Sequence, residues 1–120
     1  IERVDRPNVG LILDVIQWWA GTDGDYETLH RVKGLPLTLH VFDLPEGISR
    51  DTMEDSDRCL PGEAFIDLVR WLRTLKADGY DGDVMPEVLG PRAAELADAD
   101  SWEGPKRIRD IYLELFSKVG

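Results

Sequence analysis

Cysteine and basic residues are scarce in this sequence, and each shortage excludes a class of protein. The single cysteine, Cys59, has no second cysteine in the chain with which to form a disulfide, and this favours a reducing cytoplasm as the location. Lysine and arginine number 14 against 24 aspartates and glutamates, which gives a formal net charge of -10. Because so acidic a chain repels phosphate groups, we expect neither a nucleic-acid partner nor an anionic membrane surface.

Long apolar runs are absent as well. No stretch approaches the roughly 20 apolar residues of a membrane-spanning helix. We expect no signal peptide before the first predicted strand and no membrane partner. What remains is an ordinary globular composition, 42% hydrophobic and 32% charged, in 120 residues that suffice for one domain. The chain begins at Ile1 rather than at methionine, and an apolar run starts soon afterwards. We therefore expect a piece of a longer protein.

The apolar residues form strand-like runs that alternate with helical patterns. The run VGLILDV is nearly unbroken, as in a strand buried on both faces, whereas Leu68, Leu72 and Leu75 have helical spacing. Alternating strands and helices predict an α/β fold with parallel strands joined by right-handed crossovers. We predict strands at Val9–Val15, Leu37–Asp43 and Asp83–Val88, and helices at about Asp25–Lys33, Ala64–Ala77 and Glu103–Lys118.

Two features interrupt this pattern. The connection from Leu44 to Glu63 is long for a compact domain, and long connections are often functional. Pro86 lies within the third predicted strand, where it cannot donate to the hydrogen-bond ladder, so we expect an edge position or a bulge there. Three strand–helix units are too few to close a barrel, because a complete eight-unit barrel takes about 250 residues.

Polar side chains lie where the predicted strands end. Asp14 lies near the end of the first strand, the second carries His40, and the third carries Glu87. Strand side chains alternate between faces, and this alternation places His40 and Glu87 on the face away from the helices; we place Asp14 there too. The C-terminal ends of parallel strands are where α/β enzymes keep their active sites. We therefore expect these three side chains to converge.

Two carboxylates and an imidazole around one cavity indicate a bound cation. Buried carboxylates are unfavourable unless a positive charge compensates them. One imidazole with several carboxylate oxygens suits manganese, magnesium or cobalt, with zinc as a further candidate. Any one of these residues alone is more often a strand-end polar group or a helix cap, so the prediction of a divalent metal site depends on the set.

At these residues the sequence resembles the sugar phosphate isomerase/epimerase family, the xylose isomerase-like TIM barrels. That family has a strand ending D-x-x-H, a strand reading H-x-x-D, an arginine with a P-G segment, and a strand with a glutamate. The resemblance covers nearly the whole chain. It implies that residues 1–120 are a single C-terminal fragment, the last three βα units of a TIM barrel. The corresponding segments are Asp14-Val-Ile-Gln17, His40-Val-Phe-Asp43, Arg58-Cys-Leu-Pro61-Gly62-Glu63 and Pro86-Glu87.

The resemblance also implies a role for each matching residue. Asp14, His40 and Glu87 correspond to metal ligands, and Glu87 also corresponds to one of two acid/base carboxylates. The other carboxylate, which is also the fourth ligand, would lie on an earlier strand outside this sequence. Arg58 corresponds to a substrate-binding arginine. Gln17 stands where the family commonly has histidine; it can donate a hydrogen bond to a substrate oxygen but does not titrate near neutral pH.

The implied activity is that of a divalent-metal-dependent isomerase or epimerase of carbohydrate metabolism. Such an enzyme removes a proton beside a carbonyl, forms a metal-bound enediolate and returns the proton. The long predicted loop is rich in acids and disfavours a phosphorylated substrate, so we expect a neutral sugar or polyol as the small-molecule partner. These acids are Asp51, Glu54, Asp55 and Asp57.

Two other functions stay open. The same intermediate can expel a β-hydroxyl, which would make the protein a lyase or dehydratase on a cyclic polyol or glycoside. The absence of histidine at position 17 slightly favours this reaction. Alternatively, the chain is a non-catalytic fragment, and we expect the fragment alone to be inactive. Its open strand edges predict poor folding or self-association into a homo-oligomer.

Two further residues near the predicted site have alternative interpretations. Trp18 follows the first strand, where its ring could stack on a sugar face as a substrate-binding group or pack within the protein. Asp43 could orient His40 or a substrate hydroxyl, or it could cap the start of the loop.

Overall fold

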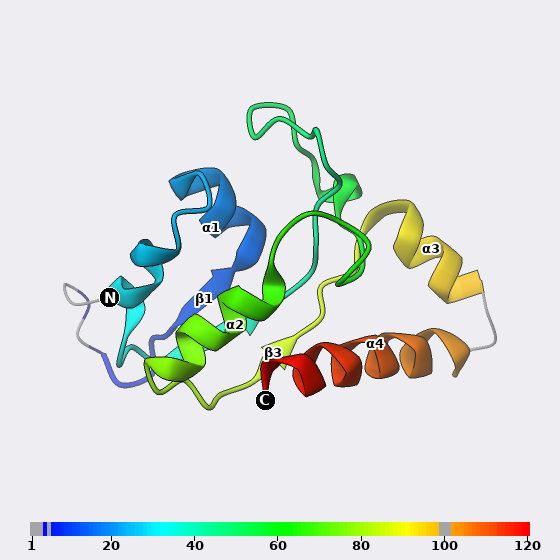
Figure 1. Cartoon of the computed structure of the whole chain (residues 1–120). Helices are drawn as coiled ribbons and strands as arrows, with labels where there is room; N and C mark the ends of the chain where they lie inside the picture. Colours follow the sequence, from blue (N-terminus) through cyan, green and yellow to red (C-terminus); the bar gives the residue numbers. More distant parts are fainter. Residues whose placement is uncertain (1–3, 5, 99–101) are drawn as a thin grey trace.

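The computed structural model describes residue 4 and residues 6–98 and 102–120 (Figure 1). Within these ranges the chain alternates strands and helices, which confirms the predicted α/β class. The elements in chain order are β1 (Leu11–Asp14), α1 (Val15–Thr22), the 3-10 helix η1 (Tyr26–Val32), β2 (Leu37–His40), the 3-10 helix η2 (Asp55–Asp57), α2 (Leu68–Ala77), β3 (Val84–Met85), α3 (Gly90–Asp98) and α4 (Glu103–Val119).

The strands of the described residues form one parallel sheet in the order β1-β2-β3. Asp14 is in register with His40, and His40 is in register with Met85. All three strands lie where the sequence predicts them, but each is shorter than expected. The third ends at Met85, directly before Pro86, because a proline nitrogen has no proton to donate to the neighbouring strand.

The helices differ more from the prediction than the strands do. The helix expected at about 25–33 is the 3-10 helix η1, and α2 begins at Leu68, where Asp67 accepts a hydrogen bond from the backbone N–H of Arg70. The last helix extends one residue further than expected, to Val119. Two α-helices of the described residues were not predicted: α1, which follows β1 without a loop, and α3, which lies between the third predicted strand and the last predicted helix.

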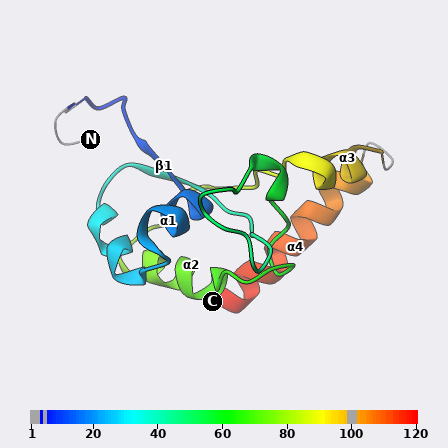
Figure 2. The same ribbon diagram turned by 90° about the horizontal axis from the view of Figure 1, so that it is seen from above.

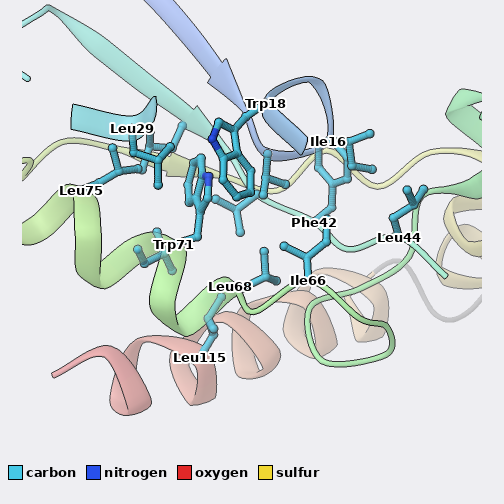
Figure 3. Packing of buried hydrophobic residues seen from close by; sticks show 14 of the residues in the cluster. Ile16, Trp18, Leu29, Phe42, Leu44, Ile66, Leu68, Trp71, Leu75 and Leu115 are labelled. Atoms are coloured by element: carbon cyan, nitrogen blue, oxygen red, sulfur yellow. The ribbon is translucent and has the colours of Figure 1, made fainter. Parts of the chain in front are cut away.

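The hydrophobic core lies on one face of the sheet, between the strands and the helices α1, α2 and α4 (Figures 1 and 2). Trp71 of α2 and Leu39 of β2 are fully buried at its centre, and the hydroxyl of Tyr112 in α4 donates to the carbonyl of Val41. The labelled side chains of Figure 3 show this core from nearby. A side chain from the middle of α4 thus contacts the residue that follows β2 directly, which holds the C-terminal edge of β2 in place.

The opposite face of the sheet is open. Ile12 is 60% exposed and Met85 is 48% exposed, although both are large apolar residues within strands. Their register with β2 puts them on the same face as His40. Among the described helices, none combines the length and the apolar character that crossing a membrane requires.

Candidate metal centre

Asp14, His40 and Glu87 converge at the C-terminal edge of the sheet. Each offers one ligand atom, and these atoms all lie within 4.8 Å of one another. The register explains this: Asp14 and His40 are paired across β1 and β2, and Glu87 follows Met85 by two residues, so all share one face. All three side chains are partly buried. The structure therefore brings together the three residues that the sequence predicts as metal ligands.

The two carboxylate oxygens of Asp14 have different partners. Oδ1 accepts the backbone N–H groups of Ile16 and Gln17, both at 2.9 Å, and so caps the N-terminus of α1. Oδ2 faces Nη1 of Arg58 at 3.5 Å. The helix cap thus fixes the rotation of the carboxylate, because one oxygen is held by α1 while the other is directed at the site.

His40 contacts Glu87 at one carboxylate oxygen, Oε2. Nδ1 of His40 lies 3.3 Å from Oε2 of Glu87, and the same oxygen accepts a hydrogen bond from Nη1 of Arg58. A nitrogen and carboxylate oxygens close together form a donor set that suits zinc, manganese or cobalt. The residues present therefore fit a divalent metal, and their negative charge is here offset by an arginine.

Arg58 belongs to the same cluster, although the sequence indicates it as a substrate-binding group. Its side chain is only 9% exposed. Its guanidinium lies over the ring of Phe42 at 4.2 Å, and Nη2 donates to Asp55 at 2.7 Å. This role of Asp55 was not predicted from the sequence. Its signal is the spacing, because Asp55 precedes Arg58 by three residues across the single turn of η2.

Trp18 is a core residue, so the interpretation of its ring as a sugar-stacking platform is wrong. Its side chain is 6% exposed, and its indole nitrogen donates to Thr28 at 3.0 Å. The ring packs edge-on against Tyr26 and Trp71, with centroid distances of 5.0 and 6.2 Å. Figure 3 shows Trp18 beside Trp71. Gln17, by contrast, is exposed in the first turn of α1, next to the site residue Asp14.

Asp43 holds the loop after β2, which is the second of its two sequence interpretations. Its carboxylate is buried and accepts the backbone N–H groups of Leu44 at 2.9 Å, Ile66 at 3.1 Å and Gly62 at 3.3 Å. Burial raises the pKa of this carboxyl, and the backbone donors oppose the rise. The backbones of Asp43 and Cys59 also pair in an antiparallel bridge. Asp43 therefore positions Arg58, the neighbour of Cys59, and does not orient His40.

Replacing Asp43 by asparagine should lower the free energy of unfolding by about 1–3 kcal/mol, because an amide presents only one oxygen to three buried N–H groups. Urea unfolding of the full-length protein measures this loss. Asp51→Asn is the matched control, since Asp51 is exposed in the same loop and should change stability by less than about 0.5 kcal/mol. Equal effects of the two substitutions would show that the Asp43 carboxylate does not hold the loop.

Known proteins with related sequences give this geometry a context. A family model described as xylose isomerase-like TIM barrel matches residues 1–110. The inosose isomerase of Bacillus subtilis (strain 168) is 29% identical over 118 residues, which cover 98% of this chain and 42% of that protein. The 3-dehydroshikimate dehydratase of Pseudomonas aeruginosa is 33% identical over 119 residues, which cover 95% of this chain and 18% of that protein.

A solved structure also resembles the chain. The crystal structure of the IOLI protein with a binding zinc atom superposes with a TM-score of 0.85 at 26% identity, over 100% of this chain and 42% of that one. The chain thus spans about two fifths of the length of the inosose isomerase and of IOLI. The family model covers nearly all of the sequence, and the parallel sheet and the residues at its edge agree with it. The chain therefore belongs to the xylose isomerase-like TIM barrel family.

Proposed function

We propose that the full-length protein is a divalent-metal-dependent isomerase of a sugar or polyol ketone, with Asp14, His40 and Glu87 as metal ligands. The observation that carries this proposal is the convergence of one imidazole and two carboxylates, with ligand atoms within 4.8 Å, at the C-terminal edge of a parallel sheet. The similarity to an inosose isomerase and to a zinc-binding structure supports it.

Each side chain of the site has a distinct task in this reaction. A bound divalent metal would supply positive charge that stabilises developing negative charge on the substrate oxygens. Glu87 acts as a base that takes the proton from the carbon beside the substrate carbonyl. Nδ1 of His40, 3.3 Å from Oε2 of Glu87, keeps this carboxylate in place. The exposed Gln17 offers an amide N–H to a substrate hydroxyl.

The three βα units correspond, in this proposal, to the last three of an eight-unit barrel. Two facts support this: the chain spans about two fifths of its relatives, and the sheet face that bears the site is open, with Ile12 and Met85 exposed. The second acid/base carboxylate, which is also the fourth ligand, then comes from an earlier strand of the full-length protein. The complete enzyme is therefore the object of every activity test.

The substrate we infer is neutral rather than phosphorylated. The loop that reaches the site through Arg58 carries the exposed acids Asp51, Glu54 and Asp55, and their charge repels a phosphate group. The only arginine that this loop turns toward the site is already paired with carboxylates in the part of the chain that the structure describes. A free sugar or a cyclic polyol ketone carries no phosphate, so the loop acids do not repel it and it needs no unpaired arginine for binding.

A dehydratase is the second candidate, and the similarity to a 3-dehydroshikimate dehydratase favours it. Both reactions start with the removal of a proton beside a carbonyl, but a dehydratase then expels a hydroxyl from the neighbouring carbon. The products differ, because isomerisation conserves mass while dehydration removes one water. Mass spectrometry of the product therefore separates the two activities.

Removal of the His40 imidazole should abolish tight metal binding. We expect wild-type full-length protein, stripped by a chelator, to bind zinc, manganese or cobalt in isothermal titration calorimetry, and His40→Ala to bind with an affinity lowered by more than about 100-fold. The other histidine provides the control: His30 is exposed on η1 and paired with Asp78, so His30→Ala should bind like wild type. Absence of binding in the wild type, or unchanged binding in His40→Ala, would rule out the proposed centre.

A further inference from the structure

Arg58 lies where a metal would be needed. Its Nη1 contacts Glu87 Oε2, the oxygen that also faces His40, and lies 3.5 Å from Asp14 Oδ2, the oxygen left over from the cap of α1. One guanidinium nitrogen therefore contacts both candidate carboxylate ligands. Two carboxylates this close repel each other unless a positive charge lies between them, and here Arg58 supplies that charge.

The position of Arg58 is built into the fold. The guanidinium stacks over Phe42 and is almost completely shielded from solvent. Its second nitrogen, Nη2, donates to Asp55, an exposed residue of η2. The backbone bridge between Asp43 and Cys59 holds the neighbouring residue against the end of β2. One nitrogen of the guanidinium thus faces the candidate ligands, while the other faces the loop residue Asp55.

We infer that Arg58 is a placeholder cation, which neutralises Asp14 and Glu87 in the metal-free protein and must withdraw from them when a divalent metal binds. This inference rests on the proposed function. A dication held by Asp14 and Glu87 would use the oxygens that Arg58 contacts, and like charges at close range repel strongly. The two cations therefore compete for the same oxygens. Arg58 withdraws toward Asp55, and its freed Nη1 then becomes available to a substrate oxygen.

Neutralising Arg58 should strengthen metal binding. We expect Arg58→Gln in the full-length protein to bind zinc on the order of tenfold more tightly than wild type in calorimetry, because the competitor is removed. Arg50→Gln is the matched control: it deletes the same charge from a surface arginine paired with Asp23, and its zinc affinity should equal that of wild type. Far-ultraviolet circular dichroism checks that each variant is folded.

A crystal structure of the zinc-loaded wild type provides a second measurement that needs no variant. It should show Nη1 of Arg58 separated from Glu87 Oε2, which contacts zinc instead. Arg58→Gln that binds zinc no more tightly than wild type, or an unbroken Arg58–Glu87 contact beside bound zinc, would overturn the placeholder role while leaving the metal centre intact. Zinc binding in neither protein would overturn the proposed function as well.

Discussion

Glu87→Gln should leave the full-length protein folded and reduce its turnover by roughly 10²–10⁴-fold, the usual contribution of a general base. Glutamine keeps the shape of the side chain and one coordinating oxygen, but it removes the negative charge and the basic lone pair. Metal affinity should also fall, because the charge that balances the cation decreases by one. Steady-state kinetics and calorimetry on the same preparation measure the two effects separately.

The two roles of Glu87 can be distinguished by adding metal. Excess manganese or zinc should refill the site of Glu87→Gln without restoring turnover, and exchange of the substrate α-hydrogen with solvent should be lost in parallel. Glu46→Gln is the matched control, since Glu46 is exposed in the loop after β2 and should behave like wild type. Full rescue by excess metal would mean that Glu87 is a ligand only and that another group moves the proton.

Trp18→Ala should destabilise the full-length protein by about 3–5 kcal/mol, the usual cost of deleting a large aromatic side chain from a core. Trp18 is 6% exposed, contacts two other aromatic rings and has its indole N–H bonded to Thr28. The substitution leaves a cavity between α1 and α2 and removes the indole donor of Thr28, whose hydroxyl keeps its bond to the Asp25 carbonyl. Equilibrium unfolding in urea, followed by circular dichroism, measures the loss.

Another tryptophan gives the control for this experiment. Trp102 is 70% exposed at the start of α4, so Trp102→Ala should change the free energy of unfolding by less than about 0.5 kcal/mol. KM for any substrate should be the same in both variants under conditions where they are folded. A Trp18→Ala protein with wild-type stability and a raised KM would restore the sugar-stacking interpretation.

The ligand set could be predicted from sequence because it depends on short-range rules. Alternation along a strand assigns faces to His40 and Glu87, and the parallel arrangement brings strand ends to one edge, so no long-range information was needed. The contacts of Arg58 could not be predicted in this way. Its partners depend on the bridge from Asp43 to Cys59 and on the turn of η2, which are tertiary features of a long loop.

The errors in secondary structure have local causes. The segment Val15–Thr22 is largely apolar, so it shows no polar face by which a helix could be recognised, and Asp14 was placed near the end of the first predicted strand. That residue is both a strand end and a helix cap. The stretch from Gly90 to Asp98 begins with glycine and proline, which predict a turn, yet proline is also well tolerated in the first turn of a helix, as in α3.

The divided carboxylate of Asp14 limits how this site can be redesigned. An engineer who wished to change metal selectivity would ordinarily exchange one ligand for a softer one, such as cysteine or histidine. At position 14 that exchange would also remove the oxygen that accepts from Ile16 and Gln17, with a loss of about 0.5–2 kcal/mol of helix stability. His40, at the end of β2, contacts Glu87, and it caps no helix in the part of the chain that the structure describes. Metal selectivity is therefore better altered at His40 in β2, because a change of ligand there does not affect the start of a helix.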